Sequence, residues 1–266
     1  MEKKSLIIVV IVMFLLAAII SFSKEALIDK EMKTDNKTTT KITTTKKEKV
    51  TTKLKEDIMD GITLNYQSSI RMEKNGKVIY FDPYKIDSNK NDADYIFITH
   101  SHYDHYSQED IKKVMKDNTK FIVTNDLESK VLSLGASSDN ILVVNPNETK
   151  KVDDLTFDII PAYNINKSYH KKSYNWVGYN LTIGSTRYYV VGDSDVTDEF
   201  KSVKCDVIFV PVGGVYTMSD SEAALSVNEM DVKVAVPVHY GEVGSRSNAE
   251  NFVNMLNENI EGIILK

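Results

Sequence analysis

Cysteine and tryptophan each occur only once in this 266-residue chain, and histidine and proline only five times each. A single cysteine excludes an intramolecular disulfide framework and any zinc or iron–sulfur site built from several thiolates. The sequence also lacks the G-x-S-x-G pattern of serine hydrolases and the GxxxxGK[ST] phosphate loop. The formal net charge of −5 argues against a nucleic-acid partner.

That net charge combines two unlike segments. Residues 1–57 carry 12 lysines and 8 acidic residues, a formal charge of +4, whereas residues 58–266 carry 21 basic and 30 acidic residues, a formal charge of −9. The second segment is long enough to bury a sizeable core. We therefore interpret the two segments separately.

The chain begins with a membrane-directed segment. Leu6–Phe22 is a run of 17 residues in which only Ser21 is polar, and two lysines precede it. At a rise of about 1.5 Å per residue, such a helix barely crosses a hydrocarbon core of about 30 Å. Residues 1–23 are therefore predicted to be a signal anchor or, because Ser21-Phe22-Ser23 fits a cleavage site, a signal peptide. A buried core helix is the alternative that the terminal position disfavours.

Residues 24–57 are predicted to be a disordered stalk. Between residues 34 and 53, nine of 20 residues are threonine and six are lysine. Such a segment cannot bury enough apolar surface to offset the entropy of ordering. Lysines on both sides of the apolar run leave the orientation open. We expect a single-pass protein of the cell membrane with an extracytoplasmic domain over residues 58–266, or a secreted protein if the first helix is cleaved.

From Ile58 onward the sequence is typical of an α/β domain. Asn75-Gly76 and Gly184-Ser185-Thr186 each predict a hairpin between two β-rich runs. The predicted strands are Ser69–Met72, Val78–Phe81, Tyr95–Thr99, Phe121–Thr124, Leu155–Ile160, Tyr179–Ile183, Arg187–Val191, Val207–Val210 and Val234–Pro237. The predicted helices are Gln108–Met115 (capped by Ser107), Leu127–Leu134, Glu222–Met230 and Ala249–Leu256. This order predicts two mixed sheets with helices outside.

The segment from Tyr95 to His105 leads from an apolar strand directly into His-x-His-x-Asp-His. In an extended chain, residues i and i+2 point to the same side, so His100 and His102 can face one metal ion. The following turn can bring Asp104 and His105 into the same pocket. Imidazole and carboxylate ligands suit zinc, manganese or iron. A lone histidine is usually structural, but three within six residues at a strand end predict a metal site.

Two more candidates follow apolar strands. Asp193 comes directly after Gly192, and His239 follows the run Val234–Val238. Each has a plain alternative when taken alone: Asp193 could cap a helix that begins at Val196, and His239 could be a core residue. Together with the histidine motif, they suit a two-metal site, which needs a bridging carboxylate and imidazoles from separate elements.

The motifs THSHYDH, GDSD and PVHYG, in this order and after strands, resemble those of the metallo-β-lactamase superfamily. The chain looks like its branch of small metal-dependent hydrolases similar to ascorbate-6-phosphate lactonases and N-acyl-phosphatidylethanolamine phospholipases D. Shorter matching stretches are Gln67–Arg71, Tyr80–Pro83, Pro161–Asn164, Trp176–Tyr179 and Pro211–Met218. The resemblance covers residues 58–266 and implies an α/β fold, a four-layer αββα sandwich with a dinuclear site at one edge.

The resemblance also implies the ligands and the chemistry. The implied metal ligands are His100 and His102 for one ion, Asp104, His105 and His239 for the other, Asp193 as the bridge, and His170. Two divalent ions are expected, zinc first, with manganese or iron as alternatives. A metal-bridging hydroxide, oriented by Asp104, would cleave an ester-type bond, phosphodiester or lactone, in a small-molecule or lipid substrate. A non-catalytic metal-binding or sensing module on the same fold is the alternative.

The sequence departs from the wider family pattern at the first ion. Many members place a histidine soon after the strand that here ends at Ile160, where this chain has Tyr163-Asn164. His170 could complete the metal site or donate a proton to the substrate; a surface histidine in a lysine-rich loop is the alternative. Asn164 is expected to contact the substrate or to support the ligands from behind. Gly213-Gly214 and Tyr216 could form a loop that lines the pocket, with Tyr216 in contact with the substrate; an ordinary turn is the alternative.

Overall fold

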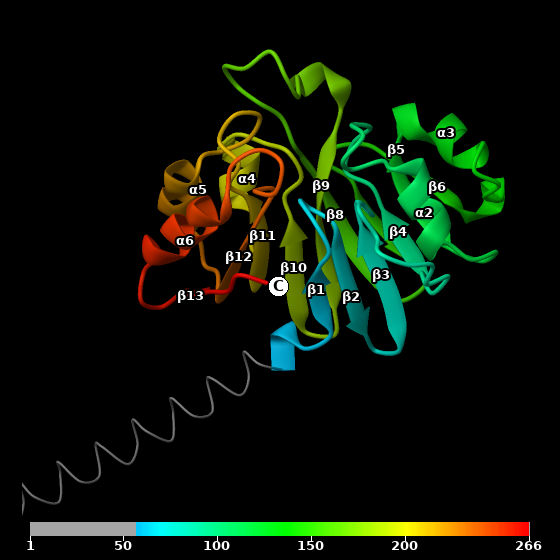
Figure 1. The fold of residues 1–266 in the computed structure, drawn as a ribbon, viewed down its shortest axis with the longest axis horizontal. Helices are drawn as coiled ribbons and strands as arrows, with labels where there is room; N and C mark the ends of the chain where they lie inside the picture. The colour runs from blue at the N-terminus through cyan, green and yellow to red at the C-terminus, as the bar shows by residue number, and fades with distance from the viewer. Residues whose placement is uncertain (1–56, 266) are drawn as a thin grey trace, which may run out of the picture. The chain divides into compact units, whose positions relative to one another are not determined.

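Two β-sheets pack face to face in the computed structural model, which describes residues 57–265 (Figure 1). The first sheet has the order β1-β2-β3-β4-β5-β6: β1 (Ile62–Leu64), β2 (Ile70–Lys74), β3 (Lys77–Phe81), β4 (Tyr95–Phe97), β5 (Lys120–Thr124) and β6 (Ile141–Val144). The second has the order β13-β12-β11-β10-β9-β8-β7: β7 (Thr149–Val152), β8 (Leu155–Pro161), β9 (Val177–Ile183), β10 (Thr186–Val190), β11 (Val207–Pro211), β12 (Val234–Val238) and β13 (Glu261–Gly262). Each sheet is mixed, with β3 to β6 parallel in the first and β10 to β13 parallel in the second.

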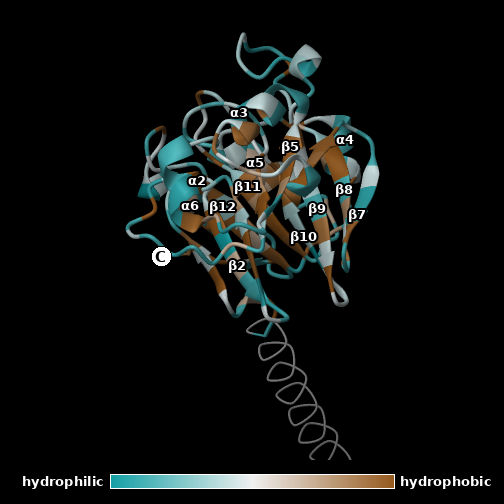
Figure 2. Ribbon diagram, turned by 90° about the vertical axis from the view of Figure 1, so that its right-hand side faces the viewer, coloured by the Kyte–Doolittle hydropathy of each residue, from teal (hydrophilic) through white to brown (hydrophobic). Residues whose placement is uncertain are grey.

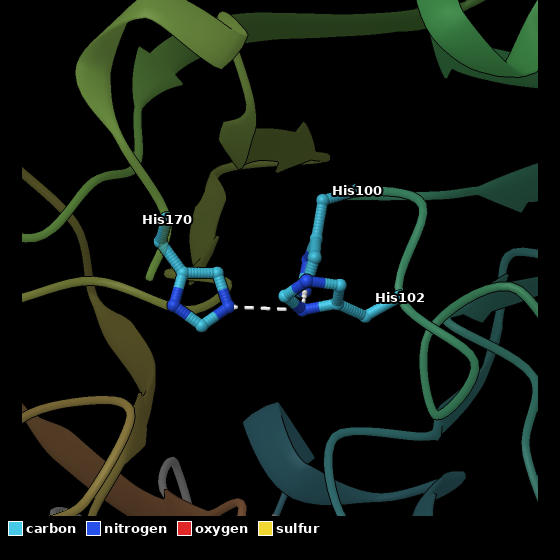
Figure 3. A group of neighbouring side chains, drawn as sticks. All are labelled: His100, His102 and His170. Atoms are coloured by element: carbon cyan, nitrogen blue, oxygen red, sulfur yellow. Dashed lines mark hydrogen bonds between the residues drawn. The ribbon is translucent and has the colours of Figure 1, made fainter. Parts of the chain in front are cut away.

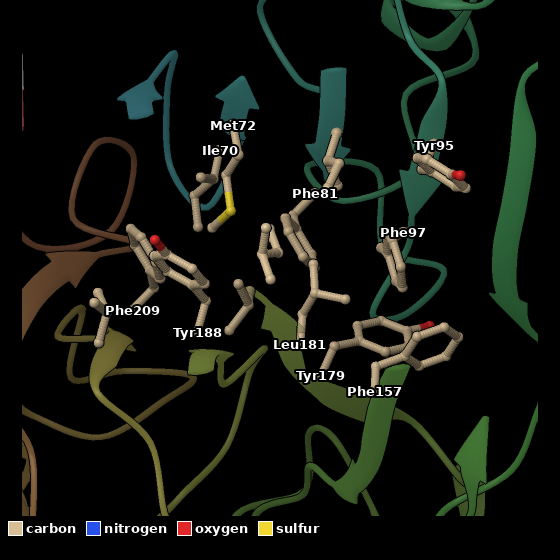
Figure 4. Packing of buried hydrophobic residues seen from close by; sticks show 14 of the residues in the cluster. Ile70, Met72, Phe81, Tyr95, Phe97, Phe157, Tyr179, Leu181, Tyr188 and Phe209 are labelled. Carbon is tan, nitrogen blue, oxygen red and sulfur yellow. The ribbon is translucent and has the colours of Figure 1, made fainter. Parts of the chain in front are cut away.

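Alternate residues of the strands build the core between the sheets. On β4, Tyr95 and Phe97 point toward the second sheet, whereas Ile96 points outward. The ring of Phe97 meets the rings of Phe157 and Tyr179 edge-on, each at a centroid distance of 5.1 Å (Figure 4). Because the inner strands are buried on both faces, they appear in the sequence as continuous apolar runs.

Helices cover the outer face of each sheet. They are α2 (Gln108–Val114), α3 (Glu128–Leu132), α4 (Asp198–Ser202), α5 (Asp220–Val227) and α6 (Arg246–Asn254), with short 3-10 turns η1 (Asn125–Leu127), η2 (Ser138–Asn140) and η3 (Lys172–Tyr174). Ile111 of α2 packs on the first sheet, and Phe200 of α4 and Phe252 of α6 pack on the second. The two sets of helices lie on opposite sides in Figure 1, and the apolar strands between them are brown in Figure 2.

The predicted pattern of two mixed sheets with helices outside is confirmed. All nine predicted strands are present, with ends shifted by up to two residues. Asn75 and Gly76 have positive φ angles of 52° and 70°, as the predicted tight hairpin turn requires. The predicted helix Glu222–Met230 instead begins at Asp220, because Ser219 caps it in a reciprocal pair of hydrogen bonds with Glu222. The strands β1, β6, β7 and β13 and the helix α4 were not predicted.

Residues 1–56 lie outside the part that the structure describes. The predicted signal anchor or signal peptide over residues 1–23 lies there, and so does the predicted stalk except for its last residue, Asp57. Both therefore stay predictions. Within residues 57–265, no helix combines the length and the apolar character needed to cross a membrane.

Candidate metal centre

The candidate site lies where several strands end. The segments after β3 and β4 come from the first sheet, and those after β8, β10 and β12 come from the second. Within each sheet these strands run in one direction, because β3 and β4 pair in parallel and β8 and β10 both pair antiparallel to β9. Strands that run in one direction bring their carboxyl ends to the same edge, so residues far apart in the sequence meet there.

The segment after β4 carries the histidine motif. The strand ends at Phe97, and the amides of His105 and Tyr106 both donate to the carbonyl of His102, at 3.1 and 2.7 Å. His100 Nε2 lies 3.2 Å from His102 Nδ1. The two imidazoles therefore converge as expected, and the turn that begins at His102 follows them.

Asp82, directly after β3, holds this segment from behind. Its carboxylate accepts hydrogen bonds from the amide of Thr99 (2.8 Å), the hydroxyl of Thr99 (2.7 Å) and Nδ1 of His105 (2.7 Å). The Asp82 side chain is fully buried. A carboxylate on one nitrogen of a histidine fixes the tautomer and leaves the other nitrogen free for a metal. Sequence reasoning assigned Asp82 no role, although its place directly after an apolar strand was a usable signal.

Asp193 lies at the centre of the site, at the end of β10. The preceding Gly192 has a φ of 71°, and a Cβ there would lie 2.9 Å from the carbonyl oxygen of Val177. Only glycine fits this turn without strain. The alternative role of Asp193 as a helix cap is wrong, because the cap of α4 is Thr197, whose hydroxyl accepts a hydrogen bond from the amide of Phe200.

The connection between β8 and β9 contributes His170. This residue is 2% exposed, so the alternative of a surface histidine is wrong. Its Nε2 lies 3.1 Å from His102 Nδ1 (Figure 3). Asn164 lies behind it: the side-chain amide donates to the carbonyl of Tyr216 (2.7 Å) and lies 3.3 Å from His170 Nδ1. The structure thus places Asn164 in support of His170, one of its two predicted roles.

His239 follows β12 and is 2% exposed. Its amide donates to the carbonyl of Gln67 at 3.0 Å. The side-chain oxygen of Gln67 accepts from the amides of Gly241 and Glu242, at 2.6 and 3.0 Å, and its nitrogen lies 3.5 Å from Asp104 Oδ2. Gln67 therefore joins the loop before β2 to the loop after β12, a role that sequence reasoning did not assign.

Four non-glycine residues of the site share a left-handed backbone. The φ angles are 50° for Gln67, 46° for Asp82, 48° for His170 and 58° for His239. Each such conformation costs on the order of 1–3 kcal/mol and persists only where surrounding contacts hold it. The hydrogen bonds described above supply that restraint.

The seven predicted ligands form two groups around Asp193. We call His100, His102 and His170 the histidine group, and Asp104, His105 and His239 the mixed group. Within each group, one ligand atom per residue lies within 4.8 Å of the others. Asp193 Oδ2 lies 3.2 Å from His170 Nε2, Oδ1 lies 3.3 Å from His105 Nε2, and Oδ2 lies 3.1 Å from His239 Nε2. One carboxylate therefore reaches both groups, and all five histidines of the chain lie in the site.

The chemistry of these atoms fits a bound metal. Among the described residues, His105 Nε2, Asp193 Oδ1 and His239 Nε2 are buried and have no hydrogen-bond partner. Buried polar atoms are rarely left unpaired, because their desolvation then goes uncompensated. A cation between them would satisfy all three.

The two groups differ in their protonation. Burial, reinforced by neighbouring imidazoles, lowers the pKa of His100 and of His102, so both are neutral at pH 7. Burial also opposes charge on His105 and His239, but nearby carboxylates outweigh it: they raise the pKa of His105 well above its usual range and that of His239 to about 9. Burial would raise the pKa of Asp104, yet His239 and His105 hold it at about 2.

A cavity of about 250 Å³ opens onto the site. Its lining residues are Gln67, His102, Tyr103, Asp104, Tyr169, His170, Asp193, Tyr216, His239, Glu242 and Val243. Tyr216 is thus placed where a substrate contact was predicted, whereas Asn164 is not among the lining residues. The backbone at Gly213 permits this arrangement, since a Cβ there would lie 2.6 Å from the carbonyl oxygen of His239.

Comparison of the sequence with known proteins identifies the family. The model of the beta-lactamase superfamily domain matches residues 62–239. A UPF0173 protein of Pyrococcus abyssi is 31% identical over 195 residues, which cover 72% of this chain and 88% of that protein. A UPF0173 metal-dependent hydrolase of Staphylococcus haemolyticus is 26% identical over 196 residues, covering 67% of this chain and 85% of that protein.

Solved structures agree with this match. A candidate metal-dependent hydrolase of Parabacteroides distasonis superimposes with a TM-score of 0.68 at 28% identity, over 77% of this chain and 91% of that one. A metallo hydrolase of the archaeon Ignicoccus hospitalis superimposes with a TM-score of 0.64 at 20% identity, over 77% of this chain and 94% of that one, and shows the shared fold.

Proposed function

Since this chain belongs to the metallo-β-lactamase superfamily, among its UPF0173 metal-dependent hydrolases, we propose that it hydrolyses an ester-type bond with two divalent metal ions. The observation that carries the proposal is the carboxylate of Asp193, which lies within 3.3 Å of imidazole nitrogens of both groups. A carboxylate shared between two sets of nitrogen and oxygen ligands is the arrangement that a two-metal site requires.

The histidine group and the mixed group would each hold one ion, with Asp193 between them. Imidazole and carboxylate ligands without thiolate suit zinc, with manganese and iron as alternatives. Bound divalent ions supply Lewis acidity, which lowers the pKa of water and neutralises charge that develops on the attacked group.

The side chains of the protein position the reactants. Asp104 is 8% exposed and has a pKa of about 2, so it stays an ionised hydrogen-bond acceptor at the floor of the cavity, where it can orient an attacking water. His170 Nε2 points at Asp193 Oδ2 from 3.2 Å, which favours the ligand role for His170 over the proton-donor role. Tyr103, Tyr169 and Tyr216 line the cavity beside these groups.

We further propose that the substrate is a phosphodiester or lactone, in a small molecule or lipid, and that the protein is held at the cell membrane. The first choice rests on the resemblance of the motifs to lactonases and phospholipases D. The second rests on the apolar run Leu6–Phe22 and the threonine-rich segment after it. Deleting residues 1–57 is expected to release the protein from the membrane fraction of expressing cells; retention there would contradict the anchor.

The decisive experiment measures metal content and turnover together. The full chain should bind close to two equivalents of divalent metal and hydrolyse members of a panel of lactones and phosphodiesters. His105→Ala should lose metal and turnover, while Asp158→Asn, on the outer face of the second sheet, should retain both. Metal binding without turnover of any substrate would support the non-catalytic alternative, and failure to bind metal would refute the proposal.

A further inference from the structure

Exposed apolar side chains concentrate around the mouth of the site. Eight large hydrophobic residues are exposed among those that the structure describes. Five of them lie on three loops that surround the metal ligands: Tyr103, Ile165, Tyr169, Tyr174 and Val215. Exposed apolar side chains that gather around a functional site often mark the surface that contacts a ligand. Tyr103 and Tyr169 also line the cavity, whereas Tyr174 does not.

Three tyrosine rings form the wall of the cavity beyond the metal ligands. Tyr169 and Tyr216 meet edge to face, with ring centroids 4.7 Å apart and an angle of 86° between the rings. Hydrogen bonds fix this wall: the carbonyl of Tyr216 accepts from Asn164, and the hydroxyl of Tyr103 donates to Glu242 at 2.6 Å. Rings held in this way present apolar surface with little loss of freedom on binding.

Beyond the histidines and the metal ions that they would hold, the cavity offers no cation to a charged substrate group. Neither lysine nor arginine is among the lining residues, and the one carboxylate beyond the metal ligands belongs to Glu242. Lys85 Nζ forms an ion pair with this group from outside the cavity, 2.7 Å from Glu242 Oε1, and itself lies over the ring of Tyr66. An anionic substituent beside Glu242, out of reach of the metal ions, would therefore face a like charge and find no cationic partner to offset its desolvation.

We propose that the substrate carries a compact, uncharged apolar group, an aromatic ring or a short acyl chain, which packs against Tyr103, Tyr169 and Tyr216 beside the bond that is hydrolysed. This inference rests on the proposed hydrolase function. The cavity volume of about 250 Å³ lies below the usual range of about 300–1,000 Å³ for drug-sized ligands, which limits the group to roughly one ring. Glu242 selects against an acidic group in the same position.

Substrate pairs that differ only in this group test the proposal. With the metal-loaded full chain, γ-phenyl-γ-butyrolactone should be hydrolysed with a kcat/KM at least about tenfold higher than γ-carboxy-γ-butyrolactone. Tyr169→Ala and Tyr216→Ala should raise KM for the phenyl lactone about tenfold with little change in kcat. Leu225→Ala, an exposed apolar residue on α5 outside the cavity, is the control. Glu242→Gln should reduce the ratio of the kcat/KM values for the phenyl and the carboxy lactone.

A binding measurement separates this proposal from the hydrolase function. Trp176 is the single tryptophan of the chain, and its ring lies 4.7 Å from that of His102, so its fluorescence reports on the site. In the metal-free full chain, 4-nitrobenzyl alcohol should quench Trp176 saturably, and Glu242→Gln should strengthen the binding of 4-nitrobenzoate while leaving that of the alcohol unchanged. Tyr169→Ala should weaken binding of the alcohol, while Leu225→Ala, exposed on α5, should not.

The outcomes are distinct. Saturable binding of the alcohol without turnover of any ester would refute the hydrolase proposal and support the apolar subsite. Turnover with equal kcat/KM for both lactones, unchanged in the tyrosine variants, would refute the subsite and leave the hydrolase function intact. If Tyr103→Ala and Tyr169→Ala abolished binding to phosphatidylcholine vesicles but left both lactone KM values unchanged, the apolar rim would be a membrane contact and the subsite would be refuted.

Discussion

The histidine group and the mixed group face the same carboxylate but are supported in different ways. In the mixed group, His105 is held by the buried Asp82, and Asp104 has Gln67 beside it. In the histidine group, His170 comes from a long connection, and Asn164 and the ion pair of Lys167 with Asp195 hold that connection in place. A rigid half and a loop-supported half thus share Asp193.

The electrostatics follow the same division. The mixed group contains the ionised Asp104 and two histidines that retain protons, whereas His100 and His102 are neutral imidazoles. Carboxylates attract a cation more strongly than neutral nitrogen atoms do. We therefore expect the mixed group to bind its metal first and more tightly, but in competition with protons.

Removal of Asp193 should weaken metal binding at both groups, because both depend on its carboxylate. Asp193→Ala is expected to lower the amount of metal bound at both groups and to reduce kcat/KM by about 10³-fold or more, since bound metal ions lower the activation free energy by several kcal/mol. Metal analysis and steady-state kinetics check this. Asp198→Ala, with a side chain 99% exposed on α4, is the control. Full retention of metal at either group would show that Asp193 is not shared.

The metal affinities of the two groups should depend differently on pH. The pKa of His239 is raised to about 9, so the metal-free mixed group is protonated at neutral pH and a metal must displace that proton. Its apparent metal affinity should therefore rise by about tenfold per pH unit for each displaced proton, and the contribution of His239 to this rise should level off above about pH 9. The affinity of the histidine group should change little above pH 6.5, since the pKa values of His100 and His102 are lowered.

Chelator competition between pH 6.5 and 8.5, with proton release followed in weak buffer, measures both affinities. His239→Ala should reduce the number of protons released, while Asp158→Asn should not. Equal pH dependence of the two groups would contradict the assigned protonation.

Asp82 should affect the mixed group more than the histidine group, because it bonds His105 directly and reaches His100 only through the hydroxyl of Thr99, which lies 3.0 Å from His100 Nδ1. Asp82→Asn replaces one acceptor oxygen with a donor, so His105 Nδ1 or Thr99 loses its partner. Loss of such a supporting carboxylate typically lowers metal affinity by about 10–100-fold. Isothermal titration should show this loss in the mixed group and a smaller loss in the histidine group. Asp92→Asn, a carboxylate that bonds Tyr80 on the same sheet, is the control; thermal unfolding of both variants excludes a general loss of structure.

The sequence predicted the ligands better than their support. His100 and Asp193 each follow an apolar strand, and such a local pattern is visible without any knowledge of packing. Asp82 contacts His105 across 23 positions, and Gln67 contacts Gly241 across 174. Such contacts depend on how the two sheets and their loops pack, which no local pattern encodes.

The same reasoning explains the missed elements of the fold. β6 is mostly half-buried and β7 is partly exposed, so neither shows the continuous apolar run of an inner strand. The remote His170 was recognised as a candidate because few histidines remained unassigned, but its burial could not be predicted from the lysines around it. The structure explains that burial: the amide of Asn164 donates to the carbonyl of His170 at 2.8 Å and turns the imidazole inward.

The smallest expected effect concerns the loop that carries His170. Lys167 forms an ion pair with Asp195 and donates to the carbonyl of Thr217 at 2.7 Å, which ties the connection between β8 and β9 to two neighbouring loops. Partly exposed pairs of this kind contribute up to about 1 kcal/mol, or about fivefold in affinity. Lys167→Met should therefore weaken metal binding by the histidine group a few-fold and leave the mixed group unchanged in the same titration. Lys171→Met, an exposed lysine on the same connection, should change neither. An equal loss in both groups would mean that the loop supports the whole site, and the division into a rigid and a loop-supported half would fail.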